Sequence, residues 1–313
     1  MQQEQQSILI TGGMGFFGWN AAQYLRQRGM TVHQASSALE RYPSETQGSI
    51  IPLDVLNTAS IQAALEKTTP TMIIHAAALS APMTCEQQSE VAHAVNVIGT
   101  HNIANSASVL DIPLVLLSTD LVFNGDKNTL KDGFYTESDT PDARIVYGKT
   151  KMSAEQIFFE RTYANKQYER WIILRTSLMF GRGVAWANGF PHFAVNLLTS
   201  GKTTTLFTDQ FRTPAYIPDI AEAILQLIEL EKYGEIYHCG GGERIDRVSF
   251  VERYCAIANV DKNGIIACSM NDVPNYTTRV RDVSLYSGKL HAALNGNWQP
   301  TVLDDAFRQI MSL

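Results

Sequence analysis

The sequence lacks the features that mark membrane-spanning and nucleic-acid-binding proteins. No apolar run approaches the roughly 20 residues that a helix needs to cross a bilayer. Lysine and arginine together number 25 against 31 aspartates and glutamates, which gives a formal charge of −6, and they form no basic cluster. We therefore expect neither nucleic acid nor an anionic membrane as a partner.

Cysteine is also scarce. The four cysteines, Cys85, Cys239, Cys255 and Cys268, form no C-x-x-C pair and have no His-rich segment near them. We therefore expect no metal site and no disulfide framework. The opening residues, MQQEQQ, have neither the basic nor the apolar region of a secretory signal and predict a disordered tail. Together these absences indicate a cytoplasmic protein.

What is present is an alternation of apolar runs with helix-length amphipathic segments. The 313 residues, 45% of them hydrophobic, are enough for one large α/β unit or two small domains. Near-continuous apolar runs are typical of parallel strands that are buried on both faces. The pattern predicts an α/β fold with a doubly wound parallel sheet. Strands are expected at 7–11, 31–35, 49–53, 72–76, 114–118 and 171–175, and helices at 16–29, 58–67, 87–110 and 147–168.

The second part of the chain has a less regular pattern. After residue 176 a stretch rich in glycine and aromatic residues precedes an expected helix at 190–200, and an amphipathic helix is expected at 217–231. The segment EIYHCGG then has the pattern of a strand that returns to the first sheet. We predict a dinucleotide-binding domain over 1–176, to which 213–240 returns, and a smaller, interleaved C-terminal substrate-binding lobe over 177–212 and 241–313.

A glycine-rich turn follows the first expected strand and precedes the first expected helix. Gly12, Gly15 and Gly18 form the pattern G-x-x-G-x-x-G, with Phe16 and Phe17 between the last two. Glycine permits a tight turn and lets backbone N–H groups approach a pyrophosphate, and the helix N-terminus adds favourable partial charge. An ordinary βα turn is the alternative. The position in the first βα unit, as in a Rossmann sheet, favours binding of a nicotinamide dinucleotide.

The choice between NADP and NAD depends on the end of the second strand. NAD binding usually shows as an acidic residue there, which accepts a hydrogen bond from the ribose 2′-hydroxyl. That stretch, HQASS, contains no carboxylate, whereas Ser36, Ser37 and the nearby Arg41 can hold a 2′-phosphate. We therefore expect NADP and keep NAD as a possibility. Asp54, followed by Val55, is expected at the adenine edge; its alternative role is that of a carboxylate at a helix N-terminus.

Tyr147 and Lys151 are spaced four residues apart in an expected helix. Residues at this spacing share one helix face. A phenol titrates near pH 10, and a neighbouring ammonium lowers that pKa by about 1–3 units. Such a pair can exchange a proton with a carbonyl/alcohol couple. Alone it is weak evidence, since the spacing arises easily by chance.

The motifs together resemble the extended short-chain dehydrogenase/reductase family and, within it, the dTDP-4-dehydrorhamnose reductase branch. They occur in the family's order and cover roughly residues 7–230. The segments that carry the resemblance are GGMGFFG (12–18), HAAA (75–78), STDLVFNG (118–125), YGKTK (147–151), LRTSLMFG (174–181) and DQFRTPAYIPDIAEAI (209–224).

The resemblance implies hydride transfer to a keto group of a nucleotide-bound sugar. Tyr147 would give a proton to the nascent alkoxide, and Lys151 would lower the Tyr147 pKa and hold the nicotinamide ribose. Thr119 matches the family's Ser/Thr that hydrogen-bonds the carbonyl oxygen. Asp120 would orient the substrate or the tyrosine, with loop capping as its alternative role.

The resemblance also implies contacts with both ligands. Ala76, Ala77 and Ala78 would lie under the cofactor, where small residues leave room. Arg212 is a candidate for pairing with a substrate diphosphate, and Asn188 for contacting the nucleotide. Either can equally be a solvated loop residue.

The expected substrate side departs from the branch. Leu121 replaces a tyrosine, Leu178 replaces a tryptophan, and the stretch LSAPMTCEQ, which contains Met83, replaces a charged segment. Two further arginines, Arg279 and Arg281, are expected to add charge to the same cleft. The redox residues are intact, and the identity of the sugar or ketone stays open.

Three functions remain open at this point. The first is an NAD(P)H-dependent reductase of a nucleotide-activated keto sugar or a related ketone. The second is an NAD-dependent nucleotide-sugar epimerase, which uses the same Tyr/Lys pair and retains its cofactor. The third is a non-catalytic, dinucleotide-binding regulatory subunit. The resemblance further implies a homodimer.

Overall fold

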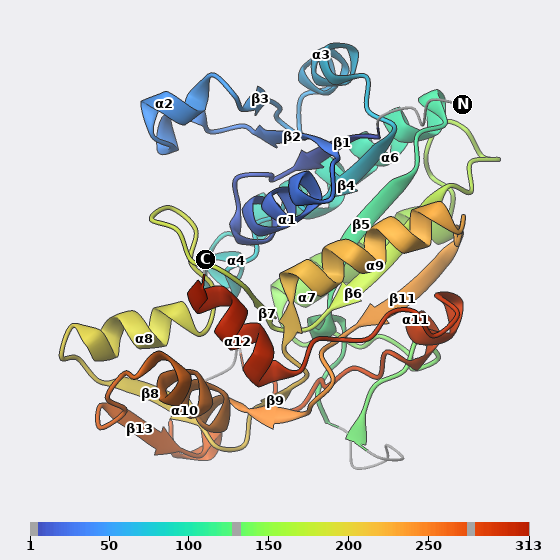
Figure 1. The fold of residues 1–313 in the computed structure, drawn as a ribbon. Coiled ribbons are helices and arrows are strands. Elements are labelled where there is room, and N and C mark those ends of the chain that lie inside the picture. The colour runs from blue at the N-terminus through green and yellow to red at the C-terminus, as the bar shows by residue number, and fades with distance from the viewer. Residues whose placement is uncertain (1–5, 127–132, 274–278, 313) are drawn as a thin grey trace.

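The fold is built on one parallel sheet. The computed structural model describes residues 6–126, 133–273 and 279–312; the expected N-terminal tail falls, apart from its last residue, outside these ranges. The seven strands lie in the order β11-β6-β5-β4-β1-β2-β3, and every neighbouring pair is parallel (Figure 1). They are β1 Ser7–Thr11, β2 Thr31–Ser36, β3 Ile51–Pro52, β4 Met72–His75, β5 Leu114–Thr119, β6 Trp171–Thr176 and β11 Glu235–Cys239.

The strand order reverses at β1. From β1 the chain passes outward to β2 and β3, and it then crosses back to β4 and continues to β5, β6 and β11. Ligands of doubly wound sheets bind beyond the carboxyl ends of the strands at such a reversal. The glycine turn follows β1 and the HAAA segment follows β4, so the topology places both at this point. The expected α/β doubly wound sheet is confirmed, and β11 returns to it beside β6 as the pattern indicated.

Helices cover both faces of the sheet. On one face α1 and α9 pack on the strands through residues such as Leu25 and Ile224, and on the other α3, α6 and α7 pack through residues such as Ile103 and Phe158 (Figure 1). The helices of this part are α1 Phe16–Gln27, α2 Ser44–Gln47, α3 Thr58–Thr68, α4 Pro82–Gln87, α5 Ser89–His93, α6 Gly99–Leu110, α7 Val146–Phe159 and α9 Ile217–Glu229.

Two of the expected helices differ from the structure. The stretch 87–110 is not one helix, because Gln88 has a non-helical backbone and a π-helical turn at Ala94–Ile98 joins α5 to α6. The helix expected to reach residue 168 ends at Phe159. Arg161 adopts a left-handed conformation with φ 49°, which stops the helix, and the following segment buries Tyr163 against the sheet's helical layer.

A smaller cluster of elements lies beyond the carboxyl edge of the sheet (Figure 1). Its apolar core contains Phe180, Phe250 and Phe307. The boundary between this cluster and the expected dinucleotide-binding domain stays a prediction. Its strands and helices are β7 Met179–Phe180, α8 His192–Thr199, β8 Thr204–Phe207, β9 Phe211–Arg212, β10 Ala215–Tyr216, β12 Ile245–Asp246, α10 Arg247–Ala258, β13 Ile265–Cys268 and α12 Leu303–Ser312. The remaining helix, α11 Gly288–Ala293, packs beside β11 of the main sheet, with Leu290 in the core of that sheet.

Candidate active site

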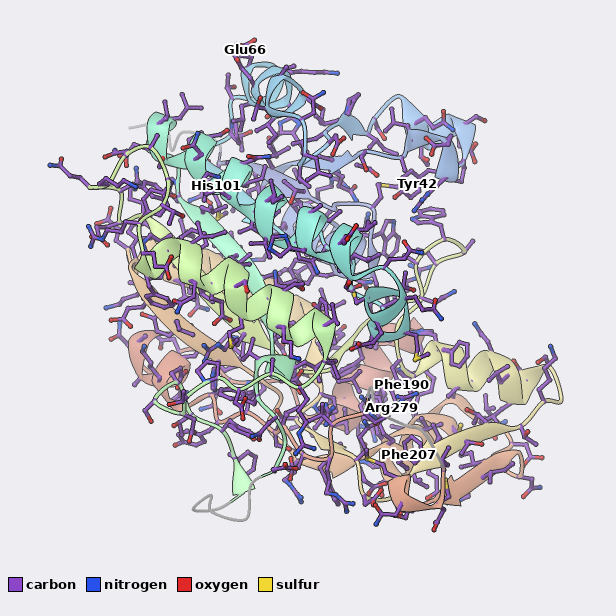
Figure 2. The ribbon with its side chains drawn as sticks, turned by 180° about the vertical axis from the view of Figure 1, so that it is seen from behind. Tyr42, Glu66, His101, Phe190, Phe207 and Arg279 are labelled. Atoms are coloured by element: carbon purple, nitrogen blue, oxygen red, sulfur yellow. The ribbon has the colours of Figure 1, made fainter. Side chains whose placement is uncertain are left out.

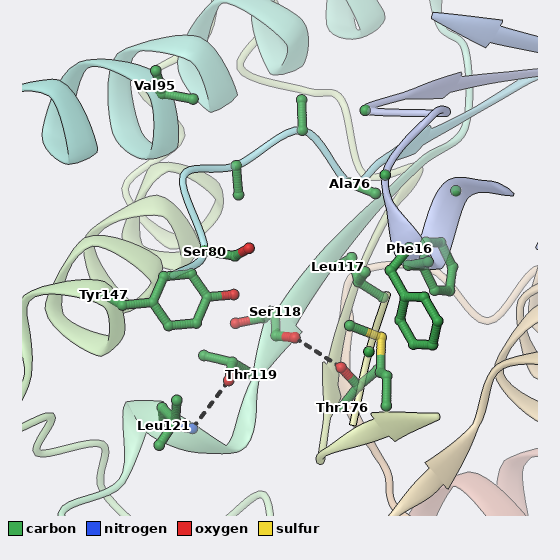
Figure 3. Close-up of a pocket in the computed structure, with 18 of the residues that line it drawn as sticks. Phe16, Ala76, Ser80, Val95, Leu117, Ser118, Thr119, Leu121, Tyr147 and Thr176 are labelled. Atoms are coloured by element: carbon green, nitrogen blue, oxygen red, sulfur yellow. Dashed lines mark hydrogen bonds between the residues drawn. The ribbon is translucent and has the colours of Figure 1, made fainter. Parts of the chain in front are cut away.

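A cavity of about 790 Å³ opens at the strand-order reversal, between the carboxyl ends of the strands and the C-terminal cluster (Figure 3). It gathers side chains from segments that are far apart in the sequence. Apart from Lys151 and the two arginines Arg279 and Arg281, every residue to which a cofactor, catalytic or substrate role was assigned above lines it. These are Gly12, Gly15, Phe16, Phe17, Gly18, Ser36, Ser37, Arg41, Asp54, Val55, Ala76, Ala77, Ala78, Thr119, Asp120, Tyr147, Asn188 and Arg212.

The glycine turn is shaped by close backbone approaches. Gly12 has φ +64°, and a Cβ there would come within 2.8 Å of the Ala77 backbone. A Cβ at Gly18 would lie 2.5 Å from the Gly12 carbonyl oxygen. Gly15 caps α1 without a side-chain hydrogen bond, so the first-turn N–H groups face the cavity with no capping side chain. Free N–H groups at a helix start are suited to a pyrophosphate.

A buried network that sequence reasoning missed joins the glycine turn to the HAAA segment. Thr11 Oγ1 lies 2.7 Å from His75 Nδ1 and accepts a hydrogen bond from the Ala77 N–H at 3.2 Å. His75 Nε2 lies 3.0 Å from Thr100 Oγ1. Burial, and then the Lys151 charge, lowers the pKa of His75 to about 3. His75 is therefore a neutral ring that fixes both loops.

The rim of the cavity near β2 carries the groups expected at the adenosine end. Ser36 Oγ lies 3.2 Å from Tyr42 Oη, and Arg41 is exposed beside it. Asp54 Oδ1 accepts a hydrogen bond from the Leu56 N–H at 2.9 Å in a local turn, whereas the side chain that caps α3 is that of Asn57. Asp54 lines the cavity as well, and its place at the adenine edge stays a prediction.

Tyr147 enters the cavity from the first turn of α7. Its ring points toward the end of β5, where Thr119 lies (Figure 3). Thr119 Oγ1 donates to Asp120 Oδ1 at 3.2 Å and accepts from the Leu121 N–H at 3.2 Å. Lys151, one helical turn after Tyr147, is 2% exposed and lies behind the cavity wall.

The expected lowering of the Tyr147 pKa by Lys151 is wrong for this structure. Burial raises the Tyr147 pKa, the charges of Asp120 and Cys85 add to the rise, and only the Thr119 hydroxyl opposes it. Burial also lowers the pKa of Lys151 to about 8, against the opposing effect of Glu155. Desolvation of the buried phenol has the largest effect on its pKa, and Lys151 is not among the groups that shift it.

A second buried network lies behind Lys151. Glu155 is four residues further along α7, and it accepts hydrogen bonds from Arg175 Nε at 3.0 Å and Nη2 at 2.7 Å. Ser118 Oγ donates to the same carboxylate at 2.5 Å. The network ties the face of α7 that carries Lys151 to β5 and β6. Its one local signal in the sequence is the i, i+4 spacing of Lys151 and Glu155.

The substrate side of the cavity is more polar than the sequence indicated. Asp120 is 4% exposed, lies 3.4 Å from Arg212 Nε and accepts a hydrogen bond from Ser177 Oγ at 3.0 Å. Burial raises the Asp120 pKa, and Arg212 and Ser177 act against that rise. Arg212 Nη1 donates to the Phe211 carbonyl at 2.6 Å, and its Nη2 donates to the Val280 carbonyl at 3.1 Å. Arg212 therefore lines the cavity with most of its donors already engaged.

A smaller cavity of about 200 Å³ adjoins the large one, and both include Leu178, Phe190 and Arg247 in their walls. Arg279 lines only the smaller cavity, with its guanidinium 5.6 Å from the Phe207 ring centre; Figure 2 shows this group from behind. Arg247 was not among the site residues that the sequence predicted.

The other expected substrate-side residues are split between the wall and the surface. Leu121 and Leu178 line the large cavity, as does the exposed Asn188, whereas Met83 is 58% exposed and does not. Arg281 pairs with Asp209 at 3.0 Å and lines neither cavity.

The remaining findings concern metals, thiols and membranes. All four cysteines are free thiols. Within residues 6–126, 133–273 and 279–312, no group of three His, Cys, Asp or Glu side chains is arranged to hold a metal ion. None of the helices described for these residues has the length and apolar character that crossing a bilayer requires.

Comparison with known proteins assigns the family. The family model of the RmlD substrate binding domain matches residues 6–306. The chain belongs to this family. The match confirms the resemblance to the extended short-chain dehydrogenase/reductases and their dTDP-4-dehydrorhamnose reductase branch, and it places the chain among oxidoreductases of that type.

Three relatives illustrate the range of the family. The chain is 30% identical over 305 residues to a probable low-salt glycan biosynthesis reductase of Haloferax volcanii, covering 95% of this chain and 94% of that protein. It is 31% identical to the dTDP-4-dehydrorhamnose reductase of Aggregatibacter actinomycetemcomitans, over 75% and 73% of the two chains. It is 28% identical to methionine adenosyltransferase 2 subunit beta of Xenopus tropicalis, over 80% and 71%.

Solved structures share the fold. A dTDP-4-dehydrorhamnose reductase from Bacillus anthracis, solved in complex with NADP, superposes with a TM-score of 0.82. The match covers 98% of this chain and 99% of that chain at 23% identity. This similarity confirms the Rossmann-type architecture of the sheet.

Proposed function

We propose that the protein is an NAD(P)H-dependent reductase that transfers hydride to a keto group of a nucleotide-activated deoxysugar. The observation that carries the proposal is the convergence of Tyr147, Thr119 and the glycine turn on one cavity at the strand-order reversal. The glycine turn lies about a hundred residues before Thr119, and Tyr147 reaches the same cavity from a separate helix, α7. The reductases among the family relatives support the same class of reaction.

The residues of the cavity fit a nicotinamide dinucleotide. The uncapped N-terminus of α1, after Gly15, would hold the pyrophosphate. Ser36, Ser37 and Arg41 would hold a 2′-phosphate, which favours NADP over NAD, and Ala76 to Ala78 would lie under the bound cofactor. When bound, the reduced cofactor supplies the hydride.

The protein's part in the reaction is to hold the ketone and deliver a proton. The Thr119 hydroxyl would donate a hydrogen bond to the carbonyl oxygen. As the carbonyl carbon gains a hydride, the oxygen becomes an alkoxide and takes the Tyr147 proton, so the product is a neutral alcohol. Because the Tyr147 pKa is raised by burial, the phenol is protonated at neutral pH and ready to act as the acid. Protonated Lys151 would stabilise the phenolate that remains.

The test is whether the protein consumes NADPH in the presence of a dTDP-4-keto-6-deoxyhexose. The reaction is measured as the loss of NADPH absorbance. Tyr147→Phe keeps the ring and removes the proton, so we expect kcat to fall by about 10²- to 10⁴-fold. Arg308→Gln, at an exposed site far from the cavity, is the control and should retain full activity.

Other outcomes would point to the alternative functions. An epimerase is expected to retain bound NAD⁺ through purification. It would convert the sugar substrate to an isomer without net oxidation or reduction. Absence of any turnover, with stability that depends on a partner protein, is the result expected of a regulatory subunit. A Tyr147→Phe variant with unchanged turnover contradicts both enzyme functions. The homodimer and the cytoplasmic location stay predictions.

A further inference from the structure

Arg247 occupies the passage between the two cavities. It is the first residue of α10, and the preceding Asp246 caps that helix by accepting hydrogen bonds from the N–H groups of Val248 and Ser249. This cap fixes the backbone at the helix start, from which the arginine side chain extends. The same side chain forms part of the wall of both cavities.

The hydrogen bonding of Arg247 is incomplete. Its Nε donates to Gln210 Oε1 at 3.1 Å, and its guanidinium lies 4.8 Å from the centre of the Phe190 ring. Its Nη1 is shielded from solvent and has no hydrogen-bond partner among the residues that the structure describes. A buried donor without a partner is unfavourable, and native proteins usually satisfy such a group with water, an ion or a ligand.

Arg212 differs from Arg247 in this respect. Both line the large cavity, but Arg212 is engaged with two backbone carbonyls and with Asp120. A ligand would have to compete with these contacts to reach Arg212. It would meet an unused N–H group at Arg247.

The charges around Arg247 favour an anion. The positive charges of Arg212 and Arg279 act on it, and Asp120, already paired with Arg212, is the carboxylate that acts on it. The excess of positive charge in a partly buried passage is unfavourable until an anion enters. A guanidinium matches the oxygens of a phosphate better than any other side chain.

The smaller cavity indicates what is attached to the anion. The residues of its wall include Phe190, Phe193 and Phe207, together with Thr204 and Thr205. Phe190, Arg279 and Phe207 lie close together in this region (Figure 2). Aromatic rings stack on a flat nucleobase, and hydroxyls bond to its polar edge.

We propose that Arg247 is the residue that binds the substrate phosphate, with the attached nucleoside in the smaller cavity and the sugar ketone in the large one. This assignment rests on the proposed function, because it takes the ligand to be a nucleotide-activated sugar. It transfers to Arg247 the phosphate-binding role that the sequence indicated for Arg212. Arg212 then holds Asp120 and the Phe211 and Val280 backbone in place.

The experiment is calorimetric titration of the NADP-loaded protein with dTDP and, separately, with thymidine. In Arg247→Gln we expect dTDP to bind roughly 10- to 100-fold more weakly, as for the loss of a charge-assisted hydrogen bond, and thymidine to change by less than about 2-fold. Arg247→Lys keeps the charge without the planar fork and should recover part of the loss. Arg308→Gln, an equal change of charge at an exposed site, should match the wild type.

Three results would overturn the assignment. One is unchanged dTDP affinity in both Arg247 variants. Another is an equal loss for thymidine and dTDP in Arg247→Lys, which would mean that the pocket has collapsed. The third is weaker NADPH binding with dTDP unaffected, which would place the anion of Arg247 on the cofactor. Thermal melting shows whether each variant is folded. If Arg247→Gln does not fold, the comparison is made with Arg247→Lys.

This readout is separate from turnover. If dTDP binding depends on Arg247 but no ketone is reduced, the phosphate assignment stands and the reductase function fails. If reduction is observed and dTDP binding is indifferent to Arg247, the reductase function stands and the assignment fails.

Discussion

Two buried arginines in this molecule have different surroundings. The difference distinguishes an arginine that stabilises the fold from one that is available to bind a ligand. Arg175, on β6, is 2% exposed and has a carboxylate, a histidine and a ring around it: Glu155 at 2.7 Å, His238 Nε2 at 3.5 Å and the Phe123 ring centre at 5.3 Å. Arg247, at the cavity passage, has one amide and one ring, and an unused N–H.

The comparison shows how to tell a structural charge from one that awaits a ligand. A buried ion pair contributes little net stability but is expensive to break, because the remaining charge is left without a partner. The Glu155–Arg175 pair is complete and holds α7 against β5 and β6. Arg247 is incomplete within the protein, as expected of a residue whose partner arrives with the substrate.

The largest expected effect comes from breaking the complete pair. Arg175→Met leaves the Glu155 carboxylate buried with Ser118 as its remaining donor, so we expect the free energy of unfolding to fall by about 3–5 kcal/mol. Adding Glu155→Leu removes the orphaned charge and should recover at least half of that loss. Urea unfolding of the single and double variants measures both changes.

The matched substitution at the other arginine gives the contrast. Arg247→Met removes one hydrogen bond and leaves no carboxylate that depends on it alone, so we expect a change of about 1 kcal/mol or less. Comparable losses at Arg175 and Arg247 would contradict the distinction between the two sites. So would a double variant no more stable than Arg175→Met.

Lys151 provides a second test of how a buried charge affects stability, with an expected effect between those at Arg175 and Arg247. Its ammonium is buried, and Glu155 is the neighbouring charge that stabilises it. Its pKa falls from 10.5 in the unfolded chain to about 8 in the folded protein. Below pH 8 both states are protonated and the burial penalty is fully present. Between about pH 8 and pH 10 the unfolded chain binds more protons, so stability rises with pH.

The expected size of this rise follows from the shift in pKa. Relative to Lys151→Met, the wild type should gain roughly 2–3 kcal/mol across that window. The window ends near pH 10, where the tyrosine phenols of the unfolded chain begin to ionise. Urea unfolding at several pH values compares the two proteins. Parallel pH profiles would mean that Lys151 keeps its ordinary pKa in the fold.

The sequence predicted those features that depend on short stretches of chain. Most of the strands are visible because they are apolar runs, and the glycine turn is visible because Gly12, Gly15 and Gly18 lie within seven residues. The break in the helix at Arg161 was missed, since a left-handed residue that is not glycine carries no clear local signal.

The missed site residues depend on contacts between distant segments. Arg175 meets Glu155 only when β6 lies beside β5, and Arg247 meets the cavity only when α10 is placed against Phe190. The direction of the Tyr147 pKa was wrong for the same reason. Spacing indicates which charge is near, but burial depends on the whole fold, and at Tyr147 burial has the larger effect.

The smallest expected effect lies at the opposite, exposed end of the cavity. Arg41 is a solvent-facing cation at the rim, and exposed ion pairs contribute much less than buried ones. If it holds a 2′-phosphate, Arg41→Ala should raise KM for NADPH by roughly 3- to 10-fold and leave KM for NADH nearly unchanged. The difference should shrink as salt is added, because exposed charges are screened. Steady-state kinetics with both cofactors at two ionic strengths, with Arg308→Ala as the control, tests this. An equal rise for both cofactors would mean that Arg41 supports the rim and does not select NADP.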